Sequence, residues 1–318
     1  MSGGLAPLTA AKVLQFGELA HALELVGDRW TLLILRDAFL GVRRFEEWRR
    51  RTGASPATLT ARLRQLCAHR LLRITAGDGP RKEYRLTARG LALYPVALSL
   101  WQWETRWSRD GKLPRKLVHS ACGATLHPVL RCRHCEREAT LATSKFQLHA
   151  SQAATRSPTR SKNRRRNLHH RPGIDTHIFH SIDTVGDRWT MLLVAALMLG
   201  LSRHDELEAA LGIATNILAD RLQRLERASV VDRRQYRTRP QRYAYRLTRK
   251  GRAFFPLLVA LQDFGRSLRA SGSALLDIRH HHCNRSLDAS LTCRNCRAPI
   301  QTHEVALTGR HAHDILTR

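Results

Sequence analysis

The chain has 318 residues and a formal net charge of +28 at pH 7. Its 43% hydrophobic and 25% charged residues are ordinary for globular proteins, which excludes a wholly disordered chain, and its length predicts about two domains. A surplus of positive charge this large favours a polyanionic partner over a small acidic ligand.

The sequence carries no sign of export or of a membrane span. Its first residues lack the basic start, apolar stretch and cleavage site of a secretion signal. The longest apolar run, Met191–Leu201, is too short to cross a bilayer. Six of the seven cysteines fall into two short clusters, a spacing typical of metal sites in a reducing compartment. We therefore expect a cytoplasmic protein without a membrane partner.

The chain is a tandem repeat. Val26–Leu35 (VGDRWTLLIL) returns as Val185–Val194 (VGDRWTMLLV), and the cysteine clusters return in the same order. Each copy is therefore predicted to be one helical domain followed by one cysteine module, and a basic segment without acidic residues joins the copies. The predicted boundaries are helical domains at 1–112 and 174–272, cysteine modules at 113–145 and 273–318, and a basic flexible linker at 146–173.

The first predicted helix of each copy begins at an aspartate. Asp28 is expected to cap a helix over 29–40, and Asp187 its counterpart in the second copy, because a carboxylate there accepts hydrogen bonds from the free amides of the first turn. A second, short helix is expected over 44–51, before Gly53.

A third helix is predicted to begin at Ser55–Pro56, an N-cap followed by proline at the first helical position. Leu59, Leu63 and Leu66 share one side of this helix, which leaves short hydrogen-bonding side chains on the other side. A face of this kind can enter a groove.

A β-hairpin and a long helix are expected to follow. The segments 71–75 and 83–86 are β-like and are joined by a turn that ends in Arg81–Lys82. Thr87 is then expected to cap a long final helix. The tryptophans of that helix give more apolar surface than one small domain can bury, which indicates a subunit or domain interface.

The order GDRWTLLILR, RRFEEWRR, SPATLTARLRQL, a wing and YRLTARG resembles the HxlR family of bacterial winged helix-turn-helix regulators, which are MarR-like. Both copies show it. The resemblance implies a three-helix DNA-binding core, a two-stranded wing and dimerisation through the terminal helices. Together with the two cysteine modules, the resemblance predicts an α+β, mainly helical fold class, with two winged helix-turn-helix domains, each followed by a small zinc ribbon.

Two departures from the family pattern bear on function. Many members carry a redox-sensing cysteine where this sequence has Gly17 and Thr176, so thiol sensing is not expected there. The duplication is the second departure. It leaves open whether the chain forms an intramolecular pseudo-dimer or a homodimer.

The third helices and the wings supply the predicted DNA contacts, because hydrogen-bonding heads near a helix N-terminus are what readout in the major groove needs. Ile217 and Asp220 replace Thr58 and Ala61, so the copies are not expected to read identical half-sites, and a phosphate would be repelled by Asp220. The predicted DNA-binding residues are Ser55, Thr58, Arg62, Arg64, Gln65, Arg81, Lys82, Thr215, Asn216, Arg221, Arg224, Arg237, Arg239 and Arg242.

Each cysteine module has the pattern His-x2-Cys-x9-Cys-x2-Cys, which suits tetrahedral Zn²⁺ with three thiolates and one imidazole. Four protein ligands leave no open position for water, so two structural sites are expected. His281 and His282 compete with His280 as ligand, and merely buried thiols are the alternative to a metal. The predicted ligands are His119, Cys122, Cys132, Cys135, His280, Cys283, Cys293 and Cys296.

These features predict a sequence-specific transcriptional regulator that binds double-stranded DNA and is not an enzyme. The resemblance implies promoter occupancy that blocks or assists RNA polymerase. One alternative is a largely unspecific zinc-ribbon DNA- or RNA-binding or architectural protein, but an aromatic content of 6% leaves few platforms for base stacking. Another is a zinc-responsive sensor. Lone Cys67 is expected to be a partly buried small residue, with a reactive thiol as the alternative.

Overall fold

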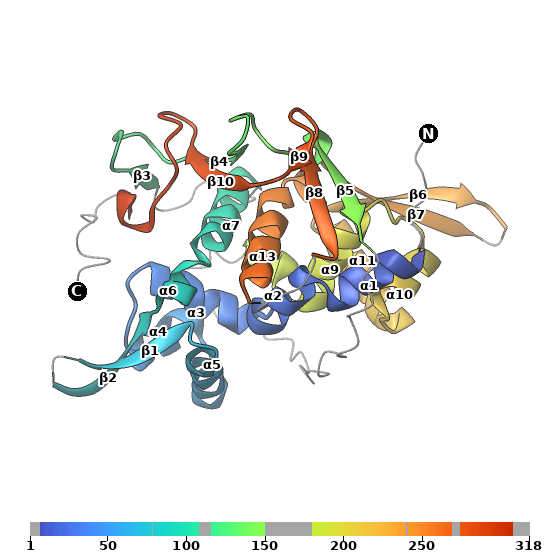
Figure 1. Cartoon of the computed structure of the whole chain (residues 1–318). Coiled ribbons are helices and arrows are strands. Elements are labelled where there is room, and N and C mark those ends of the chain that lie inside the picture. Colours follow the sequence, from blue (N-terminus) through green and yellow to red (C-terminus); the bar gives the residue numbers. More distant parts are fainter. Residues whose placement is uncertain are drawn as a thin grey trace. The chain divides into compact units, whose positions relative to one another are not determined.

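The computed structural model describes residues 7–77, 79–107, 116–149, 180–239, 241–268 and 274–307 (Figure 1). Helices and short antiparallel strands alternate along the chain, so the fold is mixed α and β, as predicted. None of the described helices is long and apolar enough to span a membrane. Most of the predicted linker, from residue 150 onward, lies outside the described residues, as does Thr176.

The chain divides into two compact units, and each unit takes segments from both copies of the repeat. One unit combines 1–27, 130–160 and 184–289, and the other combines 28–129, 161–183 and 290–318. We call the former the second-copy unit and the latter the first-copy unit, after the copy whose helix-turn-helix core each contains. The boundaries predicted from sequence follow chain order and do not contain this exchange, because a repeat does not say which copy's segments pack together.

The first-copy unit contains the predicted three helices and wing. Its helix-turn-helix core consists of α3 (Arg29–Phe39), α4 (Phe45–Thr52) and α5 (Pro56–Ala68), followed by β1 (Leu72–Gly77), β2 (Gly79–Leu86), α6 (Ala88–Leu91) and α7 (Tyr94–Trp107). Most of α8 (His180–Val185) belongs to it, with β3 (Leu117–His119), β11 (Val305–Leu307) and parts of β4 (Pro128–Cys132) and β10 (Ala289–Cys293).

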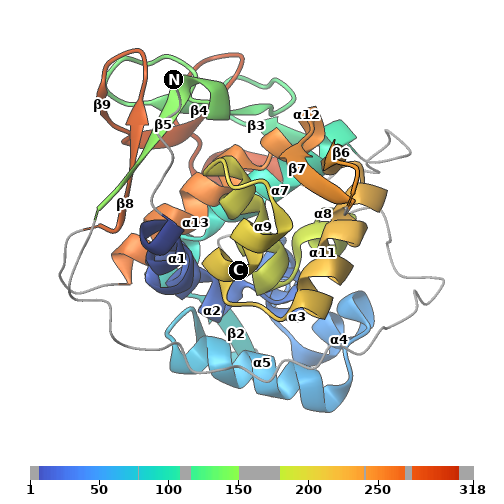
Figure 2. The same ribbon diagram turned by 90° about the vertical axis from the view of Figure 1, so that its right-hand side faces the viewer.

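The second-copy unit repeats this order. Its core consists of α9 (Arg188–Met198), α10 (His204–Leu211), α11 (Thr215–Arg227), β6 (Val231–Arg237), β7 (Arg242–Leu247), α12 (Arg249–Arg252) and α13 (Phe255–Ser267). The N-terminal helices α1 (Pro7–Phe16) and α2 (Glu18–Val26) pack on this core, with β5 (Ser144–Leu148), β8 (Leu276–His280) and β9 (Arg285–Ser286) (Figure 2).

Buried side chains explain why these segments form the core. Leu59, Leu63 and Leu66 lie on the inner face of α5 and are almost fully buried, as their spacing predicted. Trp48 of α4 is fully buried too, and its indole N–H donates to the carbonyl of Ile34 at 3.2 Å. The predicted amphipathic face of the third helix is therefore confirmed.

The predicted long final helix is wrong in one respect, because it is broken into two. Thr87 caps only the short α6, through the N–H of Gly90 at 3.1 Å, and α7 starts at Tyr94. Pro95 lacks the N–H that an uninterrupted helix would need, and it disfavours helical geometry at the residue before it. The second copy has the same break before Pro256.

Strand pairs join the two copies within each unit. In the second-copy unit β5 pairs with β8 in antiparallel register, from Ser144 opposite His280 to Leu148 opposite Leu276. In the first-copy unit β3 pairs with β11, with His119 opposite Val305. The cysteine modules of the two copies are therefore interleaved.

Candidate nucleic-acid interface and metal centres

Each helix-turn-helix core is held together by one aspartate that has two roles. The Asp28 carboxylate caps α3 by accepting from the N–H groups of Trp30 and Thr31, at 3.1 and 3.2 Å. The same carboxylate lies 3.2 Å from Nε of Arg62 on α5. In the second copy Asp187 caps α9 and lies 3.3 Å from Nε of Arg221 on α11.

These ion pairs determine where two of the predicted DNA-binding arginines lie. The side chains of Arg62 and Arg221 are only 18% and 11% exposed, and both point back to an N-cap. Arg62 also donates to the side-chain carbonyl of Gln65 at 2.9 Å. The structure therefore places all three in contacts that orient the helix, although the sequence pattern had placed Arg62 and Gln65 on its outward face.

Other positions of α5 and α11 do face solvent. Arg64 is exposed on α5, and Ser55 is exposed at its N-cap. Thr58 is half-buried, and its backbone N–H and hydroxyl contact the Ser55 hydroxyl. On α11, Thr215 and Asn216 are exposed. Gln223 and Arg227 are also exposed on α11 but were not among the predicted residues. Gln223 is the repeat counterpart of the predicted Arg64, so the register of the repeat was the available signal for it.

Asp220 of α11 is paired with arginines of its own helix. It contacts Arg221 and lies 3.0 Å from Nε of Arg224. Burial acts to raise the pKa of Asp220, but these two guanidinium groups outweigh it and hold the pKa below its ordinary value. The expected repulsion of a phosphate by Asp220 is therefore reduced by two neighbouring positive charges.

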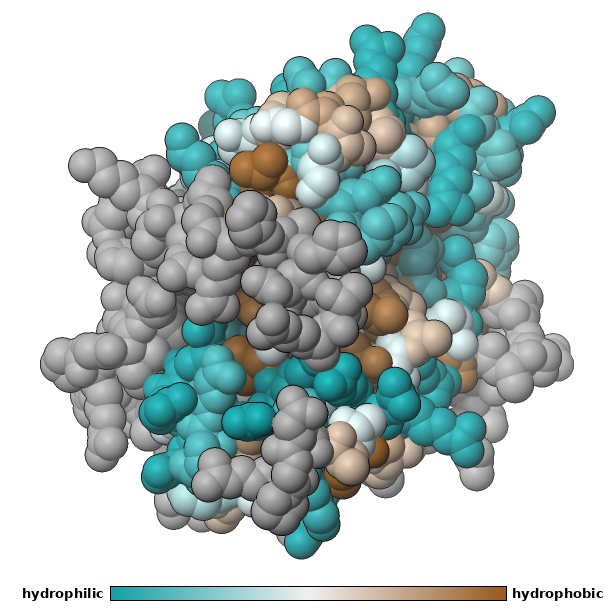
Figure 3. Space-filling model, turned by 90° about the vertical axis from the view of Figure 1, so that its left-hand side faces the viewer, coloured by the Kyte–Doolittle hydropathy of each residue, from teal (hydrophilic) through white to brown (hydrophobic). Residues whose placement is uncertain are grey.

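The two wings differ in their exposed side chains. The second wing, β6–β7, is basic along its length, and the predicted residues Arg237, Arg239 and Arg242 are exposed at its tip, with Tyr236 46% exposed. The first wing, β1–β2, exposes Lys82 and also Ile74; Arg81 lies in β2, but its side chain is outside the described residues. Figure 3, which views the molecule from the side of the first wing in Figure 1, shows hydrophilic residues over much of the described surface.

The eight predicted metal ligands gather into two clusters of four, but each cluster draws on both copies. The expectation that each module closes its own site is therefore corrected, since the cross-copy strand pairs bring together knuckles that are far apart in sequence. The four ligand atoms of each cluster lie within 4.8 Å of one another. The first-copy unit holds His119, Cys122, Cys293 and Cys296, and the second-copy unit holds Cys132, Cys135, His280 and Cys283.

The distances within each cluster match the edges of a tetrahedral metal site. The Sγ atoms of Cys122 and Cys293 are 3.9 Å apart, and those of Cys132 and Cys283 are 3.8 Å apart. A thiol Sγ approaches the imidazole Nδ1 at 3.4 Å in one cluster and at 3.3 Å in the other. Zinc–sulfur bonds of about 2.3 Å and zinc–nitrogen bonds of about 2.1 Å give tetrahedral edges of about 3.8 and about 3.5 Å.

The same backbone turn presents the ligands four times. After the last cysteine of each knuckle the chain takes a positive φ, and the N–H of that residue donates to the carbonyl four residues earlier at 2.8 or 2.9 Å. The turn leaves successive backbone N–H groups close to the thiols. The four residues with positive φ are Gly123, Glu136, Asn284 and Arg297.

The thiols of the clusters differ in their pKa values. Hydrogen bonds from the backbone N–H of Ala124 and from His119 and Asn295 lower the pKa of the Cys122 thiol to about 6. The backbone N–H of Arg285 lowers the pKa of the Cys283 thiol. Burial raises the pKa of Cys132. The backbone N–H of Ala298 acts to lower the pKa of Cys296, but burial and the neighbouring thiols outweigh it and raise that pKa. Thiolates are the form that binds metal, so the described clusters could hold a metal ion. Of the three adjacent histidines, His280 faces the cluster.

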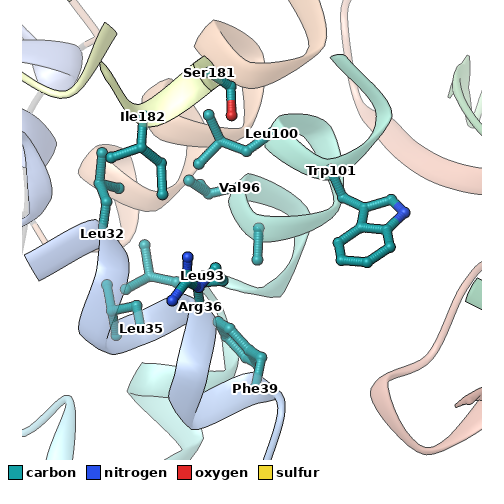
Figure 4. A pocket seen from close by; sticks show the side chains of 11 residues that line it. Leu32, Leu35, Arg36, Phe39, Leu93, Val96, Leu100, Trp101, Ser181 and Ile182 are labelled. Carbon is teal, nitrogen blue, oxygen red and sulfur yellow. The ribbon is translucent and has the colours of Figure 1, made fainter. Parts of the chain in front are cut away.

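An apolar cavity of about 40 Å³ lies in the first-copy unit between α3, α7 and α8 (Figure 4). Leu32 and Leu35 line it on one side, Val96 and Ala97 on another, and Ile182 closes it. This volume is far below the roughly 150 Å³ of an apolar cavity that holds benzene, so the space has no room for a ligand of that size.

Cys67, on α5, is half-buried, and burial raises the pKa of its thiol.

Comparison with known proteins agrees with the two cores. The family model of the HxlR-like helix-turn-helix matches residues 25–112 and again 184–272, which together exceed half of the chain. The chain belongs to the HxlR-like helix-turn-helix family. In that family's terms α5 and α11 are the recognition helices, and β1–β2 and β6–β7 are the wings.

Relatives match single stretches of this HxlR-like chain. Rv3095 of Mycobacterium tuberculosis (strain ATCC 25618 / H37Rv), named as an uncharacterized HTH-type transcriptional regulator, is 46% identical over 125 residues, which are 38% of this chain and 79% of the relative. The similarly named sll1512 of Synechocystis is 36% identical over 28% of this chain and 68% of its own length. The solved reduced form of the transcriptional regulator YodB of Bacillus subtilis is 28% identical, covers 30% of this chain and 95% of its own, and has a TM-score of 0.27.

Proposed function

We propose that this chain regulates transcription by binding two unequal half-sites of duplex DNA, one with each winged helix-turn-helix core. Membership of the family makes it a DNA-binding transcriptional regulator. The finer proposal is supported by one observation above all: a single chain carries two such cores whose exposed recognition faces differ, with Arg64 on α5 where α11 has Gln223.

The proposed binding mode assigns different tasks to helices and wings. The exposed residues of α5 and α11, beginning with Ser55 and Thr215, face the major groove, and the exposed wing arginines contact the flanking backbone. Arg62 and Arg221 act by fixing each recognition helix against the N-cap of the preceding helix. Promoter occupancy then blocks or assists RNA polymerase.

Selection of bound fragments from a random duplex DNA pool tests this proposal, at about 150 mM salt, where unspecific binding to phosphates is already weakened. We expect enrichment of two unequal half-sites. If no motif is enriched and RNA competes as well as duplex DNA, the chain is instead an unspecific nucleic-acid binder.

We also propose that each four-residue cluster holds one structural Zn²⁺. Three thiolates and one imidazole are a donor set typical of structural zinc, and four protein ligands leave no position for a substrate. The metal would tie a knuckle of one copy to a knuckle of the other, more than 100 residues away in the chain. Its role is to complete the fold of each unit.

Chelation separates a structural zinc from a sensed one. If the metal is structural, its removal is expected to lower the thermal midpoint of unfolding and to destabilise both units, because the strands paired across the copies lose the metal that joins them. A zinc sensor predicts instead a folded apo-protein whose DNA affinity changes reversibly when zinc is added back. Circular dichroism and DNA-binding titrations on the same chelated sample distinguish the two.

A further inference from the structure

A buried carboxylate lies at the contact between α2 and α13 in the second-copy unit. Glu18, at the start of α2, is 1% exposed. Its carboxylate accepts a hydrogen bond from the side-chain amide of Gln262 at 3.1 Å and another from the backbone N–H of Leu275 at 3.2 Å. Both donors belong to the second copy, although Glu18 belongs to the first.

The backbones of the two helices meet at a glycine. A Cβ atom placed on Gly265 of α13 would lie 1.9 Å from the backbone carbonyl oxygen of Glu18, far inside van der Waals contact. The neighbouring atoms are backbone atoms of α2, so no side chain can rotate away to make room. This contact between α2 and α13 therefore requires glycine at position 265 (Figure 1, Figure 2).

In the first copy, the position that corresponds to Gly265 carries a charged side chain. Glu104 of α7 is the repeat counterpart of Gly265, and Trp101 is the counterpart of Gln262. In the first-copy unit Glu104 is also 1% exposed, and its carboxylate accepts from the backbone N–H of Ser181 in α8 at 2.6 Å. Each unit thus buries a glutamate at this helix contact, but from opposite partners: α2 supplies it in one unit and α7 in the other.

We infer that Glu18, Gly265 and Glu104 form a steric and charge key that lets α2 pack against α13 and excludes its packing against α7, so that each unit is completed by terminal helices of unlike copies of the repeat. If α2 met α7, the side chain of Glu104 would occupy the place where even a Cβ does not fit. Two carboxylates would also be buried together, and Trp101 would not replace the amide donor of Gln262. The exchange of terminal helices is then fixed between unlike copies.

The test of this inference is the sign of a stability change. Glycine to alanine in a helix normally stabilises it, because alanine has the higher helix propensity. Here Gly265→Ala is expected to lower the melting temperature of the zinc-loaded full-length chain by more than about 5 °C. Ser267→Ala, an exposed change to the same residue on the same helix, is the matched control and is expected to leave the melting temperature unchanged. A Gly265→Ala chain that melts at or above the unaltered chain would contradict the steric key.

Discussion

In the pairing of Asp28 with Arg62, repeated as Asp187 with Arg221, one carboxylate contacts two helices of the core. The carboxylate both starts the first helix of the core and holds the recognition helix at its side. A helix that must enter a groove needs a fixed orientation on its domain. The aspartate of the recurring GDRW motif and the arginine of the recurring third helix are therefore parts of one contact.

Removal of this contact should affect folding more than readout. Arg221→Ala is expected to destabilise the chain by about 1–3 kcal/mol, because its side chain is mostly buried and Asp187 would lose a partner. Arg64→Ala removes an exposed side chain and should stay within about 0.5 kcal/mol while weakening DNA binding. Urea unfolding and DNA titration of both variants measure the contrast; equal stability of the two variants would show that the buried pair contributes nothing.

The small cavity beside α7 gives a second prediction at this scale. Ala97 lines the cavity, and its repeat counterpart in the second copy is the larger, buried Leu258. Ala97→Leu is expected to stabilise the first-copy unit by up to about 1 kcal/mol by filling space that is empty. Thermal unfolding measures the gain, with Ala92→Leu at an exposed position as control. A clear loss of stability would mean that the added side chain is too large for the cavity and strains its walls.

At the scale of elements, the knuckles carry ligands whose partners lie in the other copy. Each knuckle repeats the same turn, with positive φ after its last cysteine, so local structure gives all four the same ability to bind. Among the described strands, the pairs β3–β11 and β5–β8 bring together the two knuckles that share each site. The metal content of the protein therefore reports the pairing of these strands.

Double substitutions distinguish cross-copy sites from sites closed within one copy. Cys122→Ser with Cys293→Ser removes two ligands of one cluster, so one zinc per chain is expected to remain. Cys122→Ser with Cys132→Ser removes one ligand from each cluster, so both sites should weaken. Closure within each copy predicts the reverse for the two pairs. Zinc measured in purified full-length variants decides between them.

The same elements show how far sequence could reach. The types of metal ligand and their turns follow from local spacing, so the eight candidate metal ligands and the helix caps at Asp28 and Ser55 could be predicted. The pairing of knuckles could not, because the copies are so alike that no local pattern distinguishes one partner from the other. The burial of Arg62 depends on a contact across 34 residues, for which the joint recurrence of the aspartate and the arginine was the available signal. Helix α2 was missed because its N-cap is Gly17, which has no side chain to cap the first turn.

At the scale of the whole molecule, duplication gives one chain two cores that can diverge independently. A dimer of identical chains presents the same recognition helix twice and favours a palindromic site. Here α5 and α11 differ at exposed positions, and the second wing is far more basic than the described part of the first. The operator is therefore expected to be asymmetric, with a fixed order of half-sites.

Arg64 and its counterpart Gln223 offer the sharpest test of that asymmetry. Both are exposed at the same position of their recognition helices, but arginine favours guanine and glutamine favours adenine as a bidentate partner in the major groove. Arg64→Gln should change preference at one half-site by about 1–3 kcal/mol, or roughly 5- to 150-fold, and leave the other half-site unaltered. Gln223→Arg should do the reverse, and repeated selection from the duplex pool measures both. Loss of affinity spread evenly over both half-sites would show that these side chains contact the phosphate backbone and do not read bases.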